Sequence, residues 1–158
     1  MKIGVFAGSF CPVTLGHVDA IEQASKLVDK LVVVMGVNIS KQYVIPQQAR
    51  LDMLTKSLAH LSNVEVVSYD GMLTDYCKQI GASVMIKSIR NALDCQSVID
   101  LSDINQSYWD GLTVFVVGSK QYRHVSSSLV REVASLGKDF SEYVPACCLE
   151  EIKRYLVK

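Results

Sequence analysis

The sequence has no excess of charge of one sign and no long hydrophobic run. Its 16 Lys and Arg side chains balance its 16 Asp and Glu side chains, so a broadly basic surface for nucleic acid is not expected, and affinity for phosphate must be local. No uninterrupted apolar stretch reaches the length of about 18 residues that a membrane span needs. The apolar run near the N-terminus is also shorter than the hydrophobic region of a signal peptide. We therefore expect no nucleic-acid or membrane partner, no export and a cytoplasmic location.

The cysteines show no disulfide framework. The five cysteines are an odd number, and no Cys-x-x-Cys pair occurs among them. Secreted proteins held by disulfide bonds have even, regularly spaced cysteines, so a reducing compartment fits this chain better. Cys147 and Cys148 are adjacent, but no histidine or second cysteine pair lies near them. A plain apolar start to a helix is therefore favoured over a metal or redox site at this pair.

Proline and glycine are too sparse to form a linker between two folding units. The three prolines and nine glycines are scattered, and neither repeats nor low-complexity tracts occur. A chain that is 49% hydrophobic and 20% charged has the composition of a folded protein rather than a disordered one. Because 158 residues suit one domain, we predict a single domain over residues 1–158.

Short apolar runs alternate with helical periods along the chain. The runs are rich in β-branched residues and bounded by Gly, Ser or Asn, as buried strands are; they lie at Ile3–Ala7, Leu31–Gly36, Val64–Val67, Val84–Ile86 and Thr113–Val117. The clearest helical periods are Val18, Ile21 and Val28; Leu51, Leu54, Leu58 and Leu61 after Pro46; Ser127–Ser135; and Leu149–Val157. This alternation predicts an α/β fold, a single Rossmann-like domain in which helices cover both faces of a five-stranded parallel sheet. Ligands are expected beyond the carboxyl ends of the strands.

The loop after the first strand has the features of a phosphate site. It ends in Gly16 and His17 at a helix start, where free amides bind phosphate, glycine permits close approach, and histidine adds a donor. The helix is expected to carry Asp19 early and Lys26 and Lys30 late, which matches its dipole. The dinucleotide fingerprint GxGxxG and the P-loop pattern are both absent. Taken alone, a histidine beside a helix start is more often a cap or packing residue.

A second donor-rich segment follows the last strand. Residues 118–131 contain three serines, Ser126–Ser128, at the start of another helix. Capping that helix needs one serine, not three. Two such helix starts at one sheet edge suit a nucleoside triphosphate bound between them.

These two segments resemble the paired motifs of one enzyme family. Thr14–His17 is similar to the (T/H)xGH signature of nucleotidyltransferases related to class I aminoacyl-tRNA synthetases, and Val125–Arg131 is similar to their ISSSxVR-type signature. The nearer resemblance is to the phosphopantetheine adenylyltransferases of bacterial coenzyme A synthesis. It extends over nearly the whole chain, including Ser40–Lys41, Asn63–Val67, Ile89–Arg90 and Tyr143–Pro145.

The resemblance implies a reaction, partners and a set of site residues. ATP and 4′-phosphopantetheine would give dephospho-coenzyme A and pyrophosphate, with Mg²⁺ on the nucleotide phosphates and no protein ligand for the metal. The family also implies a homohexamer and feedback inhibition by coenzyme A. The implied catalytic residues are His17 and Lys41. The implied ATP-binding residues are Ser9, Phe10, His17, Ser88, Ile89, Arg90, Val98, Tyr122, Arg123, His124, Val125, Ser126, Ser127 and Ser128. The implied phosphopantetheine-binding residues are Ser9, Lys41, Leu73 and Lys87.

Three departures from the family pattern leave the function open. Cys11 stands where the family usually has Asp, Lys87–Ser88 replaces Arg–Gly, and Val98 replaces an acid. One alternative is therefore a catalytically weakened relative that binds adenine nucleotide or coenzyme A as a sensor. Another is a nucleotidyltransferase with a different acceptor, such as nicotinate mononucleotide or a cytidylyl-transfer substrate. The chain lacks the RTEGIST-like segment of the cytidylyl-transferring branch, so ATP is expected over CTP.

Several site residues also have plainer explanations. Lys41 is also explained as an ordinary lysine in a loop. Either Lys87 or Arg90 is also explained as the partner of Asp94 in an ion pair. His60 is explained as a surface histidine at the end of a helix. His124 is explained as a side chain that only covers the serine cluster.

Overall fold

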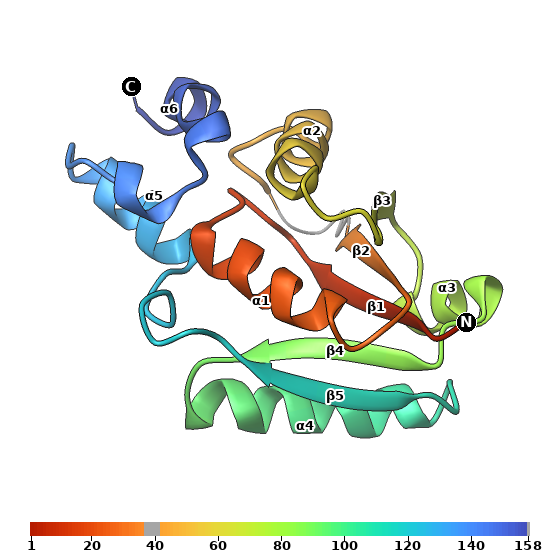
Figure 1. Ribbon diagram of the computed structural model, residues 1–158. Helices are drawn as coiled ribbons and strands as arrows, with labels where there is room; N and C mark the ends of the chain where they lie inside the picture. The colour runs from red at the N-terminus through yellow and green to blue at the C-terminus, as the bar shows by residue number, and fades with distance from the viewer. Residues whose placement is uncertain (37–41, 158) are drawn as a thin grey trace.

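A computed structural model describes residues 1–36 and 42–157. Its five strands form one parallel sheet in the order β3-β2-β1-β4-β5 (Figure 1). The strands are β1 (Ile3–Gly8), β2 (Lys30–Gly36), β3 (Val64–Tyr69), β4 (Val84–Ile89) and β5 (Leu112–Val117). All five predicted strands are confirmed, and each extends one to three residues beyond the apolar run that predicted it. In the described part of the chain, no helix is long and apolar enough to cross a membrane.

Helices cover both faces of the sheet, as predicted (Figure 1). They are α1 (Leu15–Ser25), α2 (Gln47–Leu58), α3 (Leu73–Ile80), α4 (Ala92–Gln106), α5 (Ser127–Ser135) and α6 (Leu149–Leu156), with short 3₁₀ helices η1 (Ser141–Tyr143) and η2 (Ala146–Cys148). The larger core cluster joins one sheet face to α1, α2, α5 and α6. The smaller cluster joins the other face to Cys77 of α3 and to Trp109, whose indole donates to the Ala82 carbonyl. The chain therefore has one sheet with an apolar layer on each side.

Two predicted helices are shorter than their apolar periods. The helix α1 ends at Ser25, so Lys30 begins β2 instead and pairs with Glu65 of β3. Val28 nevertheless lies in the core, because the turn after α1 packs it against Gly4. Leu61 likewise lies beyond the end of α2 and still packs on the core. An apolar period thus continues beyond the end of a helix when the turn that follows packs on the same side of the core as the helix.

The cysteine pair has the place predicted for it. Cys147 and Cys148 lie in η2, directly before α6, and their sulfur atoms are 3.6 Å apart as free thiols. Cys148 is buried against α2, where it donates to the Met53 carbonyl. Within residues 1–36 and 42–157, no group of three His, Cys, Asp or Glu side chains is placed to hold a metal ion.

The strand order fixes the place of the ligand site. The chain runs outward from β1 through β2 to β3, then returns to the other side of β1 for β4 and β5. The connections after β1 and β4 therefore leave the sheet in opposite directions and open a crevice at its carboxyl edge. Both predicted donor-rich segments end at this edge, since one follows β1 and the other follows β5.

Candidate active site

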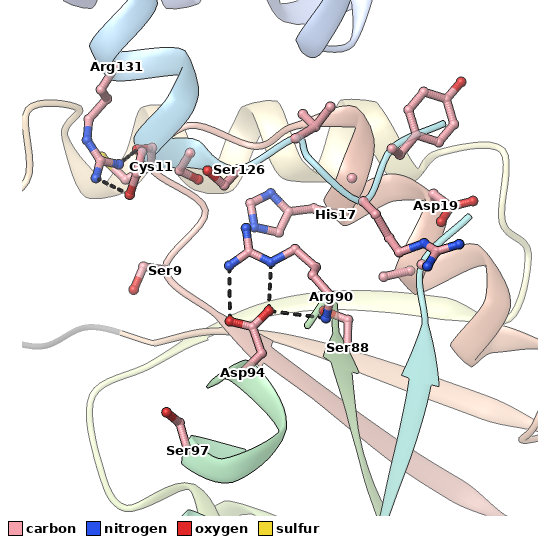
Figure 2. Close-up of a pocket in the computed structure, with 18 of the residues that line it drawn as sticks. Ser9, Cys11, His17, Asp19, Ser88, Arg90, Asp94, Ser97, Ser126 and Arg131 are labelled. Atoms are coloured by element: carbon pink, nitrogen blue, oxygen red, sulfur yellow. Dashed lines mark hydrogen bonds and ion pairs between the residues drawn. The ribbon is translucent and has the colours of Figure 1, made fainter. Parts of the chain in front are cut away.

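A pocket of about 630 Å³ occupies this crevice. It is lined by the loops that follow β1, β4 and β5 and by the first turns of α1, α4 and α5 (Figure 2). Eleven of the predicted site residues line it together: Ser9, His17, Ser88, Arg90, Val98, Tyr122, Arg123, Val125, Ser126, Ser127 and Ser128. The two sequence motifs, about 110 residues apart in the chain, thus lie side by side in the lining of one cavity.

His17 is fixed by the first turn of its own helix. Thr14 caps α1 by accepting the His17 backbone N–H, at 3.3 Å, and His17 in return accepts the Thr14 backbone N–H on Nδ1, at 3.1 Å. This reciprocal pair is a capping box in which histidine takes the usual place of Glu or Gln. The buried ring of Phe10 meets the imidazole edge to face, with centroids 5.0 Å apart. The plainer explanation of His17 as a capping residue is therefore correct and leaves its second nitrogen free.

The hydrogen bond on Nδ1 determines where the His17 proton lies. Because Nδ1 accepts a backbone N–H, the neutral ring carries its proton on Nε2, on the opposite side of the imidazole. Burial lowers the pKa of His17 to about 4, and the Arg90 guanidinium acts in the same direction. At neutral pH, His17 is therefore an uncharged hydrogen-bond donor rather than an imidazolium.

We expect the His17 ring to stay neutral throughout the range in which an ordinary histidine titrates. A depressed pKa means that the ring gains its proton only as pH falls towards about 4. The ¹⁵N shifts of the imidazole in nuclear magnetic resonance should show an Nε2–H tautomer at pH 7 and no titration near pH 6.5. Free histidine in the same buffer serves as the comparison. A His17 midpoint at or above 6.5 would contradict the neutral-donor assignment.

The start of α5 is tied directly to the loop after β1. Ser127 donates through its hydroxyl to the Pro12 carbonyl at 2.7 Å, and Arg131 donates to the Cys11 carbonyl. Ser126 caps the helix by accepting the Leu129 backbone N–H. The backbone N–H groups of Ser127 and Ser128, in the same first turn, have no acceptor within the helix and are available for an anion in the pocket.

Gly16 permits the two motifs to lie in contact. A Cβ atom at this position would lie 2.7 Å from the Val125 carbonyl oxygen and 3.3 Å from that of Tyr122. Any other residue would push the loop after β5 away from α1. The sequence interpretation explained this glycine by a close phosphate; the structure adds close approach between the two loops.

Arg90 supplies the main cationic group beside His17. Its guanidinium forms two hydrogen bonds to Asp94 in the first turn of α4, at 2.8 and 3.3 Å, so the ion pair expected for Lys87 or Arg90 belongs to Arg90 (Figure 2). These bonds hold the pKa of the Asp94 carboxyl below its usual range. Arg90 is thus oriented towards the pocket by a carboxylate on the neighbouring helix.

Some predicted residues do not line this pocket. Phe10 is buried beneath it, Ile89 is not part of its lining, and His124 is exposed with its ring edge-on to Tyr143. Lys41, and Ser40 beside it, lie outside the described residues.

Leu73 and Lys87 are both on the α3 side of the sheet. Leu73 starts α3 and packs against the smaller core cluster. Lys87 is largely buried in β4, and that burial lowers its pKa, although the nearby Cys77 thiol of α3 opposes the shift. An anion placed beside Lys87 would favour its charged form. These two residues therefore mark a region separate from the one around His17.

The sequence interpretation missed several lining residues: Asp19, Gln42, Tyr43, Val44 and Ser97. Asp19 accepts the backbone N–H of Ser119 at 2.8 Å, as well as the Ser119 hydroxyl, and so fastens α1 to the loop after β5. A carboxylate early in a helix is the signal that could have indicated this role, but its partner lies 100 positions away in the sequence.

Comparisons with known proteins agree with this geometry. Residues 5–133 match the Cytidylyltransferase-like family. A phosphopantetheine adenylyltransferase of Finegoldia magna is 39% identical over 151 residues, which cover 95% of this chain and 93% of that protein. A phosphopantetheine adenylyltransferase of Streptococcus pneumoniae strain JJA is 42% identical over 154 residues, with 96% and 95% covered. The chain belongs to the phosphopantetheine adenylyltransferase family.

The fold is also that of a solved nucleotidyltransferase. A putative nicotinate-nucleotide adenylyltransferase from Vibrio parahaemolyticus aligns with a TM-score of 0.69 and 19% identity, covering 98% of this chain and 93% of that one. At this identity the likeness concerns the fold alone. Of the positions at which the sequence analysis noted departures from the family pattern, Cys11, Ser88 and Val98 line the pocket and Lys87 does not.

Proposed function

We propose that this chain transfers the adenylyl group of ATP to 4′-phosphopantetheine, giving dephospho-coenzyme A and pyrophosphate. The observation that carries this proposal is the convergence of both nucleotidyltransferase motifs on one pocket, where neutral His17 and the start of α5 both belong to the lining. Membership of the phosphopantetheine adenylyltransferase family supplies the acceptor.

The reaction needs no nucleophile from the protein. An oxygen of the 4′-phosphate attacks the α-phosphorus of ATP in line, a new P–O bond forms, and the bond to the pyrophosphate oxygen breaks. The protein must hold two anions together and stabilise the charge that develops on the α-phosphate. His17 provides a donor on Nε2 for that charge, and Arg90 provides a cation beside it. The amides of Ser127 and Ser128 and the hydroxyls of Ser126 and Ser128 are suited to the outgoing phosphates.

The acceptor belongs on the α3 side of the pocket. Lys87 offers a buried cation there and Leu73 an apolar surface for the pantetheine arm. Ser9, which lines the pocket, is proposed to contact both substrates. Lys41, which lies outside the described residues, is proposed from family membership as the lysine on the reacting phosphate.

We propose that Mg²⁺ would be bound by the phosphate oxygens of the nucleotide rather than by side chains of the protein. Two carboxylates line the pocket, but Asp19 already accepts from Ser119 and Asp94 from Arg90. In the part of the chain that the structure covers, they form no three-ligand set with other side chains. Phosphate and water oxygens satisfy this hard cation without a protein cage. The cation offsets negative charge on the phosphates, and the proposed roles of His17 and Arg90 do not depend on protein ligands to it.

A homohexamer in the cytoplasm, inhibited by coenzyme A, is proposed on the same family basis. Apolar side chains exposed on α4, in the turn after it and on the edge strand β5 support self-association. Leu93 and Ile104 of α4 are 81% and 54% exposed, Tyr108 after the helix is 52% exposed, and Leu112 of β5 is 70% exposed. Five free thiols suit a reducing compartment.

Nucleotide and acceptor choice test the proposed function. We expect pyrophosphate release with ATP and 4′-phosphopantetheine to exceed, by at least about a hundredfold in kcat/KM, release with CTP or with nicotinate mononucleotide as acceptor. The assay varies one substrate at a time and uses enzyme without acceptor as its blank. Equal turnover with ATP and CTP would remove the chain from the adenylyl-transferring branch, and preference for nicotinate mononucleotide would favour the alternative acceptor.

A further inference from the structure

A fully buried arginine connects two walls of the pocket without lining it. Arg50 lies in α2 and is 1% exposed, yet its side chain reaches the loop after β1 and the segment before α2. We infer that Arg50 is a positioning residue for adenylyl transfer, which holds the Ser9–Phe10 peptide and, through Phe10, the His17 ring. This inference rests on the proposed function for its kinetic consequences, and on the structure alone for its effect on His17.

The first contact fixes a peptide at the pocket. Arg50 Nη1 donates to the Ser9 carbonyl at 2.8 Å. A peptide unit is planar, so fixing the Ser9 carbonyl also fixes the Phe10 N–H, which points the opposite way. Phe10 has a φ of 48°, in the left-handed region that residues other than glycine rarely adopt. Such a conformation persists where its surroundings hold it, and Arg50 is one of the groups that do so.

This contact extends to the catalytic histidine through Phe10. The Phe10 ring is 1% exposed and meets His17 edge to face at 5.0 Å. If the Ser9–Phe10 peptide rotates, the Phe10 ring moves and the imidazole loses the surface against which it is placed. The orientation of the imidazole would then depend on the Thr14 hydrogen bond to Nδ1 without the support of the Phe10 ring.

The second contact fixes a neighbouring part of the pocket wall. Arg50 Nε donates to the Ile45 carbonyl at 3.1 Å, and the guanidinium lies over the Tyr43 ring, 3.9 Å from its centroid. Tyr43 and its neighbours Gln42 and Val44 line the pocket. One planar guanidinium therefore sets the distance between this segment and Ser9. Lysine, with a single ammonium group, does not reproduce this arrangement of contacts.

The charge of Arg50 is unusual for a group that serves stability alone. Within residues 1–36 and 42–157, no carboxylate forms an ion pair with it. Burying a cation without a counter-ion is costly, and an apolar side chain of similar volume would pack in the same space at lower cost. Residues that break this rule are expected at functional sites.

Arg50→Ala, Arg50→Lys and a control on the same helix test the inference. Leu54→Ala is the control, because Leu54 is fully buried in α2 and contacts neither pocket wall through a polar group. We expect Arg50→Ala to lower kcat by about 100-fold, the scale of a small misplacement of catalytic groups. ATP affinity should fall by less than about tenfold. The His17 imidazole resonances should shift in Arg50→Ala and stay unchanged in Leu54→Ala.

Chemical rescue separates positioning from loss of stability. Guanidinium chloride at tens of millimolar, far below denaturing levels, should enter the cavity in Arg50→Ala and restore kcat at least about tenfold, whereas sodium chloride should not. Arg50→Lys, which keeps the charge and most of the volume, should fall between Arg50→Ala and the unchanged protein. That variant decides the matter if Arg50→Ala does not fold.

Wild-type kcat and His17 resonances in Arg50→Ala or Arg50→Lys would overturn the inference. So would a loss of kcat that guanidinium does not restore and that Leu54→Ala reproduces. If the unchanged protein releases no pyrophosphate with phosphopantetheine, the proposed function fails instead. The His17 resonances and ATP affinity then test Arg50 independently.

Discussion

Replacing His17 with alanine should lower the rate of adenylyl transfer by about a thousandfold or more while weakening ATP binding by no more than about tenfold. The imidazole donates from Nε2 to charge that appears on the α-phosphate during attack, so its contribution is greatest in the transition state. Single-turnover rates of dephospho-coenzyme A formation and calorimetric ATP binding measure the two effects separately.

His60 provides the matched control for this variant. It is a histidine of the same chain that lies on the surface and pairs with Glu22 at 2.7 Å. His60→Ala should leave both the rate and ATP affinity close to those of the unchanged protein. Equal losses of rate and ATP affinity in His17→Ala would instead mean that His17 acts in ground-state binding or in capping α1.

Arg90→Met should lower kcat by about a hundredfold and raise the pKa of His17 above its depressed value. The guanidinium opposes charge on the attacked phosphate, and it is also one of the two causes that depress the His17 pKa. Removing it leaves burial as the remaining cause, so the His17 midpoint should move upward from about 4 and remain below 6.5. A single-turnover assay and a ¹⁵N titration of the same variant measure both outcomes.

The partner carboxylate must be controlled in this experiment. Asp94 loses its hydrogen bonds when Arg90 is replaced. In the double variant Arg90→Met/Asp94→Asn the net charge equals that of the unchanged protein, and we expect the same loss of rate as in Arg90→Met. Full activity in the double variant would show that Arg90 serves only to neutralise Asp94.

The sheet and much of the pocket were predictable because their signals are local. β-Branched runs and turn residues identified all five strands, and three consecutive serines identified the start of α5. The spacing from Thr14 to His17 matches a capping box, so the orientation of His17 is also encoded within four residues. Because strands of a parallel sheet end at one edge, the alternation of elements was enough to bring the two motifs together.

What the sequence did not indicate depends on long-range contacts. Asp19 meets Ser119, and Arg131 meets Cys11, across 100 and 120 positions. Arg50 had the position of an ordinary helix residue, and its burial became visible only once α2 was placed beside the loop after β1. Helix ends were overestimated for the same reason, since Val28 and Leu61 belong to the core through turns rather than through helices.

Cys11 provides the most direct test of whether this chain is an enzyme or a sensor. It is buried in the loop after β1, it lines the pocket, and its carbonyl is held by Arg131. These contacts place the loop through its backbone, so the carboxylate usual at this position is not needed to form it. The decisive measurement is single-turnover formation of dephospho-coenzyme A from ATP, Mg²⁺ and 4′-phosphopantetheine by the unchanged protein and by Cys11→Asp. We predict measurable product from the unchanged protein and a gain of no more than about tenfold, roughly 1.4 kcal/mol, in Cys11→Asp. If the unchanged protein binds ATP tightly but releases no pyrophosphate, and only Cys11→Asp is active, the result would contradict this prediction and identify a nucleotide sensor.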